Sequence, residues 1–196
     1  MIKLKQILLE GKPSTIFIPR RIEDRIERLI GLYIRDGSKG NLRLAGLGLS
    51  ELPEILKNVS VGKDFYCNGN NLTSLINSPK SVGGDFFCIQ NKLTSLEGAP
   101  ESIGETFGCN NNELTSLEGA PETVGLDFWC SYNLLTTLEG APKFVGQNFI
   151  CSYNLLISLE GAPEYVDGDF YCSKNPVKFT EKQVRDVCNV GGKIIV

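Results

Sequence analysis

The chain has 196 residues, of which 22% are charged, and its formal net charge is −3. It has no histidine, the commonest general base and metal ligand in proteins, and no apolar run of about 18 residues that would span a membrane. Because the first ten residues are too polar for a secretory signal, we expect a cytoplasmic protein, or one inside a virion.

Residues 1–18 are a predicted leader. Residues 8–11 read Leu-Leu-Glu-Gly, which resembles the cleavage signal of tailed-phage prohead proteases: Leu or Ile, any residue, Glu and then a small residue. Internal head proteins of such phages begin with a leader that ends at this Glu. The resemblance implies a processing site between Glu10 and Gly11. The alternative is an uncleaved amphipathic start that packs on the following helix.

Residues 19–40 are predicted to contain an amphipathic helix that ends near Gly37. Its apolar residues recur at the spacing of one helical face. They are Ile22, Ile26, Leu29, Ile30 and Tyr33. A helix at this place can cover the first open edge of the repeats that follow.

Residues 41–179 carry a sequence repeat in which a cysteine returns every 21 residues, with a Phe two residues before it and an Asn three residues after it. The cysteines are Cys67, Cys88, Cys109, Cys130, Cys151 and Cys172. A fixed period of this length is typical of a stacked solenoid. The sequence therefore predicts a β-rich solenoid of parallel strands, with an N-terminal helix and a short C-terminal helix as caps.

One repeat illustrates the expected fold. Phe86 and Cys88 are two residues apart, so on a strand they point to the same side and would form interior ladders in a stack of strands. Asn91 is expected to turn inward and satisfy buried backbone groups, and Leu93 and Leu96 to fill the return side. The Glu-Gly-Ala-Pro segment that follows is expected to be extended or polyproline-like.

This repeat resembles the leucine-rich repeat, whose core is L-x-x-L-x-L-x-x-N-x-L. Phe86, Cys88, Asn91 and Leu93 match its second Leu, third Leu, Asn and final Leu. The repeat departs from that pattern in having Phe and Cys for Leu, and Gly83 where the first Leu is usual. It is most similar to the short, helix-poor repeats of bacterial effectors and phage-encoded proteins. The resemblance implies a curved protein whose concave sheet binds other proteins.

Residues 180–196 are the predicted C-terminal cap. Thr180 and Gln183 match a capping box, and Val184, Val187 and Cys188 share a face of the helix that follows. The last four residues could add one short strand. Since free cysteines are commonly buried, Cys188 is interpreted as part of the core.

The residues that should face outward on the strands are candidates for binding. The position between Phe and Cys gives a largely aromatic row, with tyrosines at the turn edge beside it. These residues are Arg43, Tyr66, Phe87, Trp129, Ile150 and Tyr171, with Tyr132 and Tyr153 at the edge. The row indicates a contact site, because exposed aromatic patches often mark one. The alternative is that the stacked side chains only stabilise neighbouring strands.

The position before the Phe is mostly acidic. The carboxylates are Asp64, Asp85, Asp127 and Asp169. They could bind calcium, which prefers oxygen ligands, but capping of nearby backbone amides is the better reading, because short Asp side chains do this in turns.

Residues 41–179 contain eight Lys and Arg against sixteen Asp and Glu, which gives a net charge of −8. An acidic surface repels phosphate backbones, so nucleic acid is excluded as a partner, and no metal or cofactor is expected. Because the repeats offer identical groups and inward thiols, we predict no enzymatic activity. The predicted function is protein binding through the concave sheet; the alternative is an internal or structural phage virion component with a cleavable leader.

Overall fold

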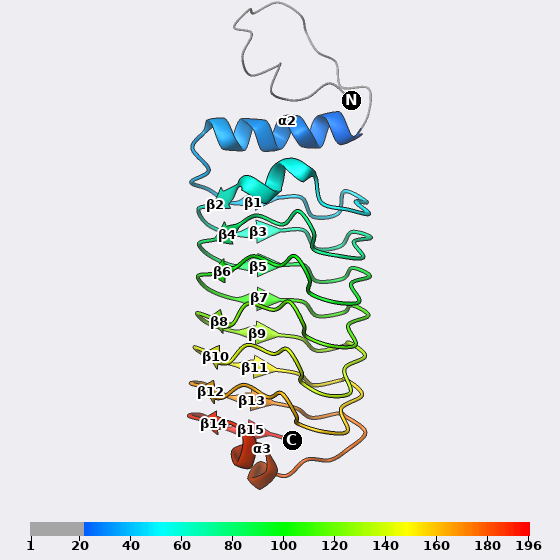
Figure 1. Ribbon diagram of the computed structural model, residues 1–196, viewed down its shortest axis with the longest axis vertical. Coiled ribbons are helices and arrows are strands. Elements are labelled where there is room, and N and C mark those ends of the chain that lie inside the picture. Colours follow the sequence, from blue (N-terminus) through cyan, green and yellow to red (C-terminus); the bar gives the residue numbers. More distant parts are fainter. Residues whose placement is uncertain (1–21) are drawn as a thin grey trace, which may run out of the picture.

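Residues 22–196 are described by a computed structural model, and they form a β-solenoid of about seven parallel turns with a helix at each end (Figure 1). Helix α2 spans Ile22–Arg35. It ends as the sequence predicts: Gly37 has a φ of +80°, and its N–H donates to the carbonyl of Ile34 at 3.0 Å.

Helix α2 covers the first turn of the solenoid. Ile26 and Ile30 are buried, and the helix contacts the 3₁₀ helix η1, which spans Glu54–Asn58. Leu29 was expected on the same buried face, but its side chain is 42% exposed, so that expectation was wrong. Ile26, Ile30 and the partly buried Tyr33 pack on the core, and Leu29 lies beside this stripe.

One parallel sheet of eight strands runs along the whole solenoid, and equivalent residues of successive repeats lie opposite one another. Its strands in spatial order are β1 (Leu42–Arg43), β3 (Phe65–Tyr66), β5 (Phe86–Phe87), β7 (Phe107–Gly108), β9 (Phe128–Trp129), β11 (Phe149–Ile150), β13 (Phe170–Tyr171) and β15 (Ile194–Ile195). Phe86, for example, pairs with Phe107. Each 21-residue repeat thus adds one strand to this sheet.

A second parallel sheet of seven strands forms the opposite wall, where the sequence analysis expected only extended or polyproline-like chain. Its strands are β2 (Ser60–Val61), β4 (Ser81–Val82), β6 (Ser102–Ile103), β8 (Thr123–Val124), β10 (Phe144–Val145), β12 (Tyr165–Val166) and β14 (Asn189–Val190). In each strand the second residue is buried and the first faces outward. The Pro that precedes β4, β6, β8, β10 and β12 does not prevent pairing, because it lies just before the ladder.

The interior between the two sheets holds the predicted ladders. The six phenylalanines that lie two residues before the repeat cysteines are fully buried, and neighbouring rings have centroids 5.1–5.6 Å apart. The repeat cysteines are buried beside them, and the thiol of Cys109 donates to the carbonyl of Trp129 at 3.2 Å. The expected inward direction of Phe and Cys is therefore confirmed.

The repeat asparagines satisfy the backbone where the chain leaves the eight-stranded sheet. Asn112 shows the pattern: its Nδ2 donates to the carbonyls of Cys109 at 3.0 Å and Cys88 at 3.1 Å. Its Oδ1 accepts from the N–H of Leu93 at 3.1 Å. Each buried asparagine thus joins two successive turns, and the cysteine carbonyls between them accept from two asparagines.

The corner between the two sheets explains why Gly83 replaces the first Leu of the leucine-rich pattern. A Cβ on Gly104, the equivalent residue of the next repeat, would collide with the carbonyl oxygen of Gly83. The backbones of successive turns approach closely here, which favours glycine, although Asp167 occupies the equivalent position in the last repeat.

Helix α3, which spans Glu181–Val187, closes the other end and begins with the predicted capping box between Thr180 and Gln183. Val184 and Cys188 are buried, but Val187 is 47% exposed, so its expected place on the buried face was wrong. Strands β14 and β15 extend both sheets by one turn. Within residues 22–196, the chain forms no helix long and apolar enough to cross a membrane.

Candidate functional site

The outward residues of the eight-stranded sheet form one continuous surface, here called the sheet face. Its central row comes from the residue between Phe and Cys of each repeat, because successive side chains of a strand point to opposite sides. The row consists of Arg43, Tyr66, Phe87, Gly108, Trp129, Ile150 and Tyr171. The predicted row is therefore present, with Arg43 exposed and the apolar side chains half-buried.

Contacts within the row explain the half-burial of the rings. The centroids of Tyr66 and Phe87 lie 5.7 Å apart, and those of Phe87 and Trp129 lie 5.6 Å apart. Gly108 lies between the last two rings and leaves them room, since a Cβ there would come within 2.6 Å of the Phe87 ring. The Nε1 of Trp129 is buried and has no hydrogen-bond partner among residues 22–196.

A cation already lies on one ring of the sheet face. The guanidinium carbon of Arg43 is 3.9 Å from the centroid of the Tyr66 ring. The hydroxyl of Tyr66 donates to Oδ2 of Asp64 at 3.0 Å. Burial, followed by this hydrogen bond, raises the pKa of Tyr66. Cation, ring and carboxylate thus form one cluster at the N-terminal end of the sheet face.

The aspartate row beside the rings binds backbone, in line with the capping interpretation. Oδ1 of Asp85 accepts from the N–H of Thr106 at 3.0 Å, and Oδ1 of Asp127 accepts from the N–H of Asn148 at 2.9 Å. Asn148 takes the same role toward Asp169 at 2.9 Å. The pKa of Asp169 is lowered, chiefly by the N–H of Lys193 and then by the Tyr171 hydroxyl.

Each aspartate uses Oδ1 for this ladder, and Oδ2 of Asp64 and of Asp169 accepts from the hydroxyls of Tyr66 and Tyr171. In the part of the chain that the structure describes, no three His, Cys, Asp or Glu residues are grouped so as to hold a metal ion. Asp85, Asp127 and Asp169 precede β5, β9 and β13, so they lie on every second strand. Residues 85–89, 106–110, 127–131, 148–152 and 169–173, which make up the centre of this face, include no Lys or Arg.

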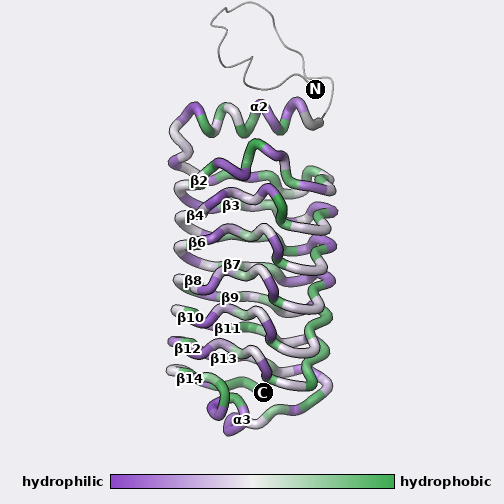
Figure 2. The backbone as a smooth tube through the Cα atoms, in the orientation of Figure 1, coloured by the Kyte–Doolittle hydropathy of each residue, from purple (hydrophilic) through white to green (hydrophobic). Residues whose placement is uncertain are grey.

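The turn edge carries a second apolar surface. The rings of Tyr132 and Tyr153 stack with centroids 4.4 Å apart, and each residue has a φ of +56°. Leu155 and Ile157 beside them are 46% and 65% exposed. The two tyrosines were predicted from the sequence, whereas Leu155 and Ile157 were not. Figure 2 shows hydrophobic colouring along this side at the level of β11 and β13.

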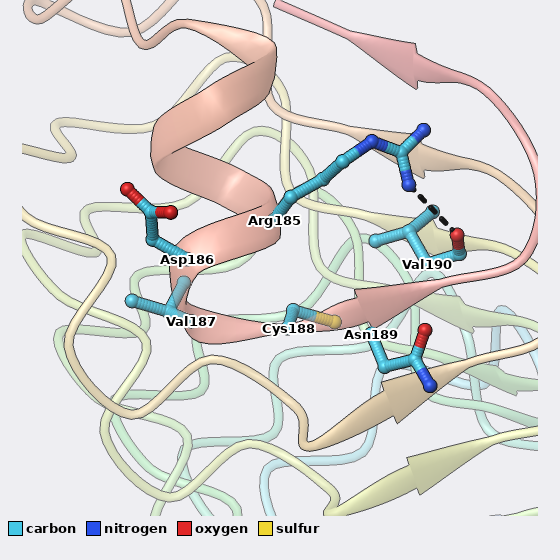
Figure 3. A pocket seen from close by; sticks show the side chains of 6 residues that line it. All are labelled: Arg185, Asp186, Val187, Cys188, Asn189 and Val190. Atoms are coloured by element: carbon cyan, nitrogen blue, oxygen red, sulfur yellow. Dashed lines mark hydrogen bonds between the residues drawn. The ribbon is translucent and has the colours of Figure 1, made fainter.

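A hollow at the C-terminal cap is lined by residues 185–190 (Figure 3). The guanidinium of Arg185 spans it and donates to the carbonyl of Val190 at 3.0 Å. Cys188 lies at its wall, 3% exposed, and burial raises the pKa of its thiol to about 11. A thiol of this kind is protonated near neutral pH, so the hollow does not provide an activated nucleophile.

The predicted leader and its processing site at Glu10 and Gly11 lie outside the described residues. The site therefore stays a prediction of the sequence alone.

No protein-family model matches the sequence, and no curated protein matches it. Among solved structures, the chain is similar to one described as "Structure of Shigella effector LRR domain". The TM-score is 0.66 at 22% sequence identity, and the match covers 90% of this chain and 80% of that chain. At this identity the likeness shows the fold: the chain is a β-solenoid like that of a leucine-rich-repeat domain.

Proposed function

We propose that this protein is a non-enzymatic interaction module that binds a protein partner through the sheet face. The observation that carries the proposal is the row of half-buried aromatic rings on an otherwise polar sheet. Partly exposed aromatic residues with a polar rim are typical of contact sites, where they supply most of the binding energy. Solenoids with a leucine-rich-repeat fold generally bind proteins through such extended surfaces.

The contacts within the row support a role in partner binding in addition to the stabilisation of neighbouring strands. The ring pairs hold the side chains in place before any partner arrives, which lowers the entropy cost of association. Tyr66 and Tyr171 are fixed further by hydrogen bonds from their hydroxyls to Asp64 and Asp169. The row thus has the rigidity of a preformed contact surface.

The interior argues against covalent catalysis. Burial raises the pKa of Cys88, Cys109 and Cys130 well above the usual thiol value. Thiols that stay protonated and lie between ring and leucine ladders are not nucleophiles. This supports the proposed absence of enzymatic activity.

A comparison of two double variants tests the proposal. Trp129 and Tyr171 are replaced by Ser in one, and Phe144 and Tyr165 in the other. The second pair serves as the matched control, because these aromatic residues are 46% and 37% exposed on the opposite sheet. We expect partners captured from the native source to bind the wild type and the control variant, and to be lost from the first variant even though it remains folded at the temperature of the assay. Equal capture by all three proteins would contradict the proposal.

We also propose a reducing setting, either the cytoplasm or, if the leader is cleaved, the interior of a virion. The support is the use of all seven cysteines as free, buried residues. Mass spectrometry of the protein from its source tests the virion alternative, which requires a chain that starts at Gly11.

A further inference from the structure

We propose that the sheet face binds an extended basic segment of its partner, in which Arg or Lys recurs at every third residue. The inference rests on the proposed function and specifies the chemistry of the partner. Three observations carry it: the charge of the face, the geometry of its carboxylate and ring pairs, and the distance between those pairs.

The centre of the sheet face is acidic. Asp85, Asp127 and Asp169 contribute carboxylates, while residues 85–89, 106–110, 127–131, 148–152 and 169–173 include no Lys or Arg. Lys193, just before β15, lies beside Asp169 at the C-terminal end of this surface, and its N–H donates to Oδ1 of Asp169. A partner that covers this surface must compensate buried or partly buried negative charge, because unpaired charges are costly to desolvate. A cationic partner meets that requirement.

Each of these carboxylates stands beside a ring. Asp85, Asp127 and Asp169 each precede, by two residues, an outward aromatic on the same face of the strand; these are Phe87, Trp129 and Tyr171. A carboxylate next to an aromatic face is a site for a guanidinium or ammonium group, which pairs with the first and lies over the second.

The chain itself shows such a site occupied. On the first two strands, Arg43 lies over Tyr66 at 3.9 Å, and Tyr66 is bonded to Asp64. Among residues 22–196, no cation lies over Phe87, Trp129 or Tyr171 in this way. The pattern of cation, ring and acid is therefore complete at one end of the face and lacks its cation along the rest.

The spacing of the pairs sets the spacing of the basic residues. The carboxylates lie on every second strand, and parallel strands are about 4.8 Å apart, so the strand positions of successive carboxylates are separated by about 9.6 Å. The rings of Phe87 and Trp129 lean toward each other, with centroids 5.6 Å apart, so the carboxylates set this spacing. A polyproline II helix advances about 9.3 Å in three residues and returns its side chains to the same side. A β-strand would place every third side chain on opposite faces. A polyproline-like segment that runs along the solenoid axis thus matches the three pairs.

Peptides test this directly, with Trp129 as the probe, because it is the only tryptophan in the chain. The first peptide repeats the unit Arg-Pro-Pro. The second has the same composition with its arginines in one block, and the third replaces Arg by Glu. We expect a saturable change in Trp129 fluorescence with the first peptide, weakened by salt, and roughly tenfold weaker binding of the second. The third should not bind.

A charge-neutral variant isolates the carboxylates. Replacing Asp85, Asp127 and Asp169 by Asn removes their charge and keeps the backbone acceptor, a role that Asn148 already fills in this ladder. The matched control replaces Glu118, Glu139 and Glu160 by Gln, which removes the same charge from the return segment. We expect the first variant to lose roughly tenfold or more in affinity for the Arg-Pro-Pro peptide, and the control to bind like the wild type.

Some outcomes overturn the inference and others overturn the proposed function as well. No fluorescence response, or equal affinity for the spaced and the blocked peptide, overturns the inference. If the captured partner is lost by the Trp129 and Tyr171 variant but kept by the Asn variant, the basic-segment inference fails and the proposed function stands. If the serine variant keeps its partners, both fail.

Discussion

Phe87 and Trp129 lie on strands that are not neighbours, yet their ring centroids are 5.6 Å apart. The strand between them, β7, contributes Gly108 to the same row and therefore no side chain. The two rings close over this gap and shield each other from solvent. The missing side chain thus lets Trp129 join the packed rings of Tyr66 and Phe87.

Replacing Gly108 by Ala should disturb this surface more than the core. The new methyl group would meet the Phe87 ring within 2.6 Å, so the ring must turn away from Trp129. We expect a loss of roughly 1 kcal/mol in the free energy of unfolding, because overpacking at a partly exposed site is only partly relieved. The near-ultraviolet circular dichroism of Trp129 should change. An unchanged spectrum would mean that the ring contact does not depend on the glycine.

Trp129→Phe should keep the stability of the protein, whereas Trp129→Ser should lower it. The indole Nε1 is buried without a partner among the described residues, so its removal costs no hydrogen bond and relieves an unmet donor. Serine also removes the contact with Phe87, which contributes roughly 0.5–1.5 kcal/mol beyond its buried area. Urea unfolding of the two variants measures the difference. A large loss in the Phe variant would show that the indole N–H is bonded in solution.

Asn112→Ala should destabilise the solenoid by roughly 3 kcal/mol. The change leaves the buried N–H of Leu93 unpaired, which costs about 1–3 kcal/mol, and removes one bond each from the carbonyls of Cys88 and Cys109, which keep their bonds from Asn91 and Asn133. Asn175→Ala is the control at the end of the ladder, where the side chain is only half-buried. Equal losses in both variants would mean that burial does not set the cost.

The repeat made the interior predictable. A residue type that returns every 21 positions must occupy the same place in each turn, so the inward Phe, Cys and Asn ladders could be predicted from spacing alone. The second sheet could not be predicted in this way. Its strands are two residues long, and steps such as Ser81–Val82 give too short an alternation to indicate a strand.

The residues of the candidate site could be predicted from the sequence, but the contacts between them could not. The sequence placed Trp129 and Phe87 in one outward row, but their mutual burial depends on the gap at Gly108, which requires coordinates. At the turn edge, Gly69 and Asn111 occupy the positions equivalent to Tyr132 and Tyr153, and both tolerate positive φ. Gly and Asn at these equivalent positions could have indicated that the tyrosines have a positive φ.

Tyr153→Asn should leave the stability of the protein within about 1 kcal/mol of the wild type. A bulky residue at a φ of +56° is strained, and Asn relieves that strain. The free energy gained in this way is about equal to the free energy lost when the stack with Tyr132 is removed. Asn111 shows that the turn accepts this residue. Thermal unfolding measures the change, and a loss above about 2 kcal/mol would assign the stack a structural role.

Stability should fall at alkaline pH because of the cysteine ladder. Burial, followed by the neighbouring Cys109, raises the pKa of the Cys130 thiol well above its ordinary value, and burial raises that of Cys172 to about 11. In the unfolded chain these thiols titrate near pH 8.5. Above that pH the unfolded state loses protons that the native state keeps, so the free energy of unfolding decreases as pH rises.

The slope identifies the thiols as the cause. Below about pH 8 both states keep their thiol protons and stability should not change on this account; above about pH 9, each buried thiol should remove roughly 1.4 kcal/mol per pH unit until its own folded pKa is reached. Urea unfolding under reducing conditions between pH 7 and pH 10 measures this slope, and Cys130→Ala should make it shallower by the contribution of one thiol. Because the same burial keeps the thiols protonated in the native state, alkylation at pH 8 should be slow for Cys130 and for Cys188 alike. A stability that stays constant up to pH 10, or rapid labelling of the native protein, would contradict the buried, neutral ladder.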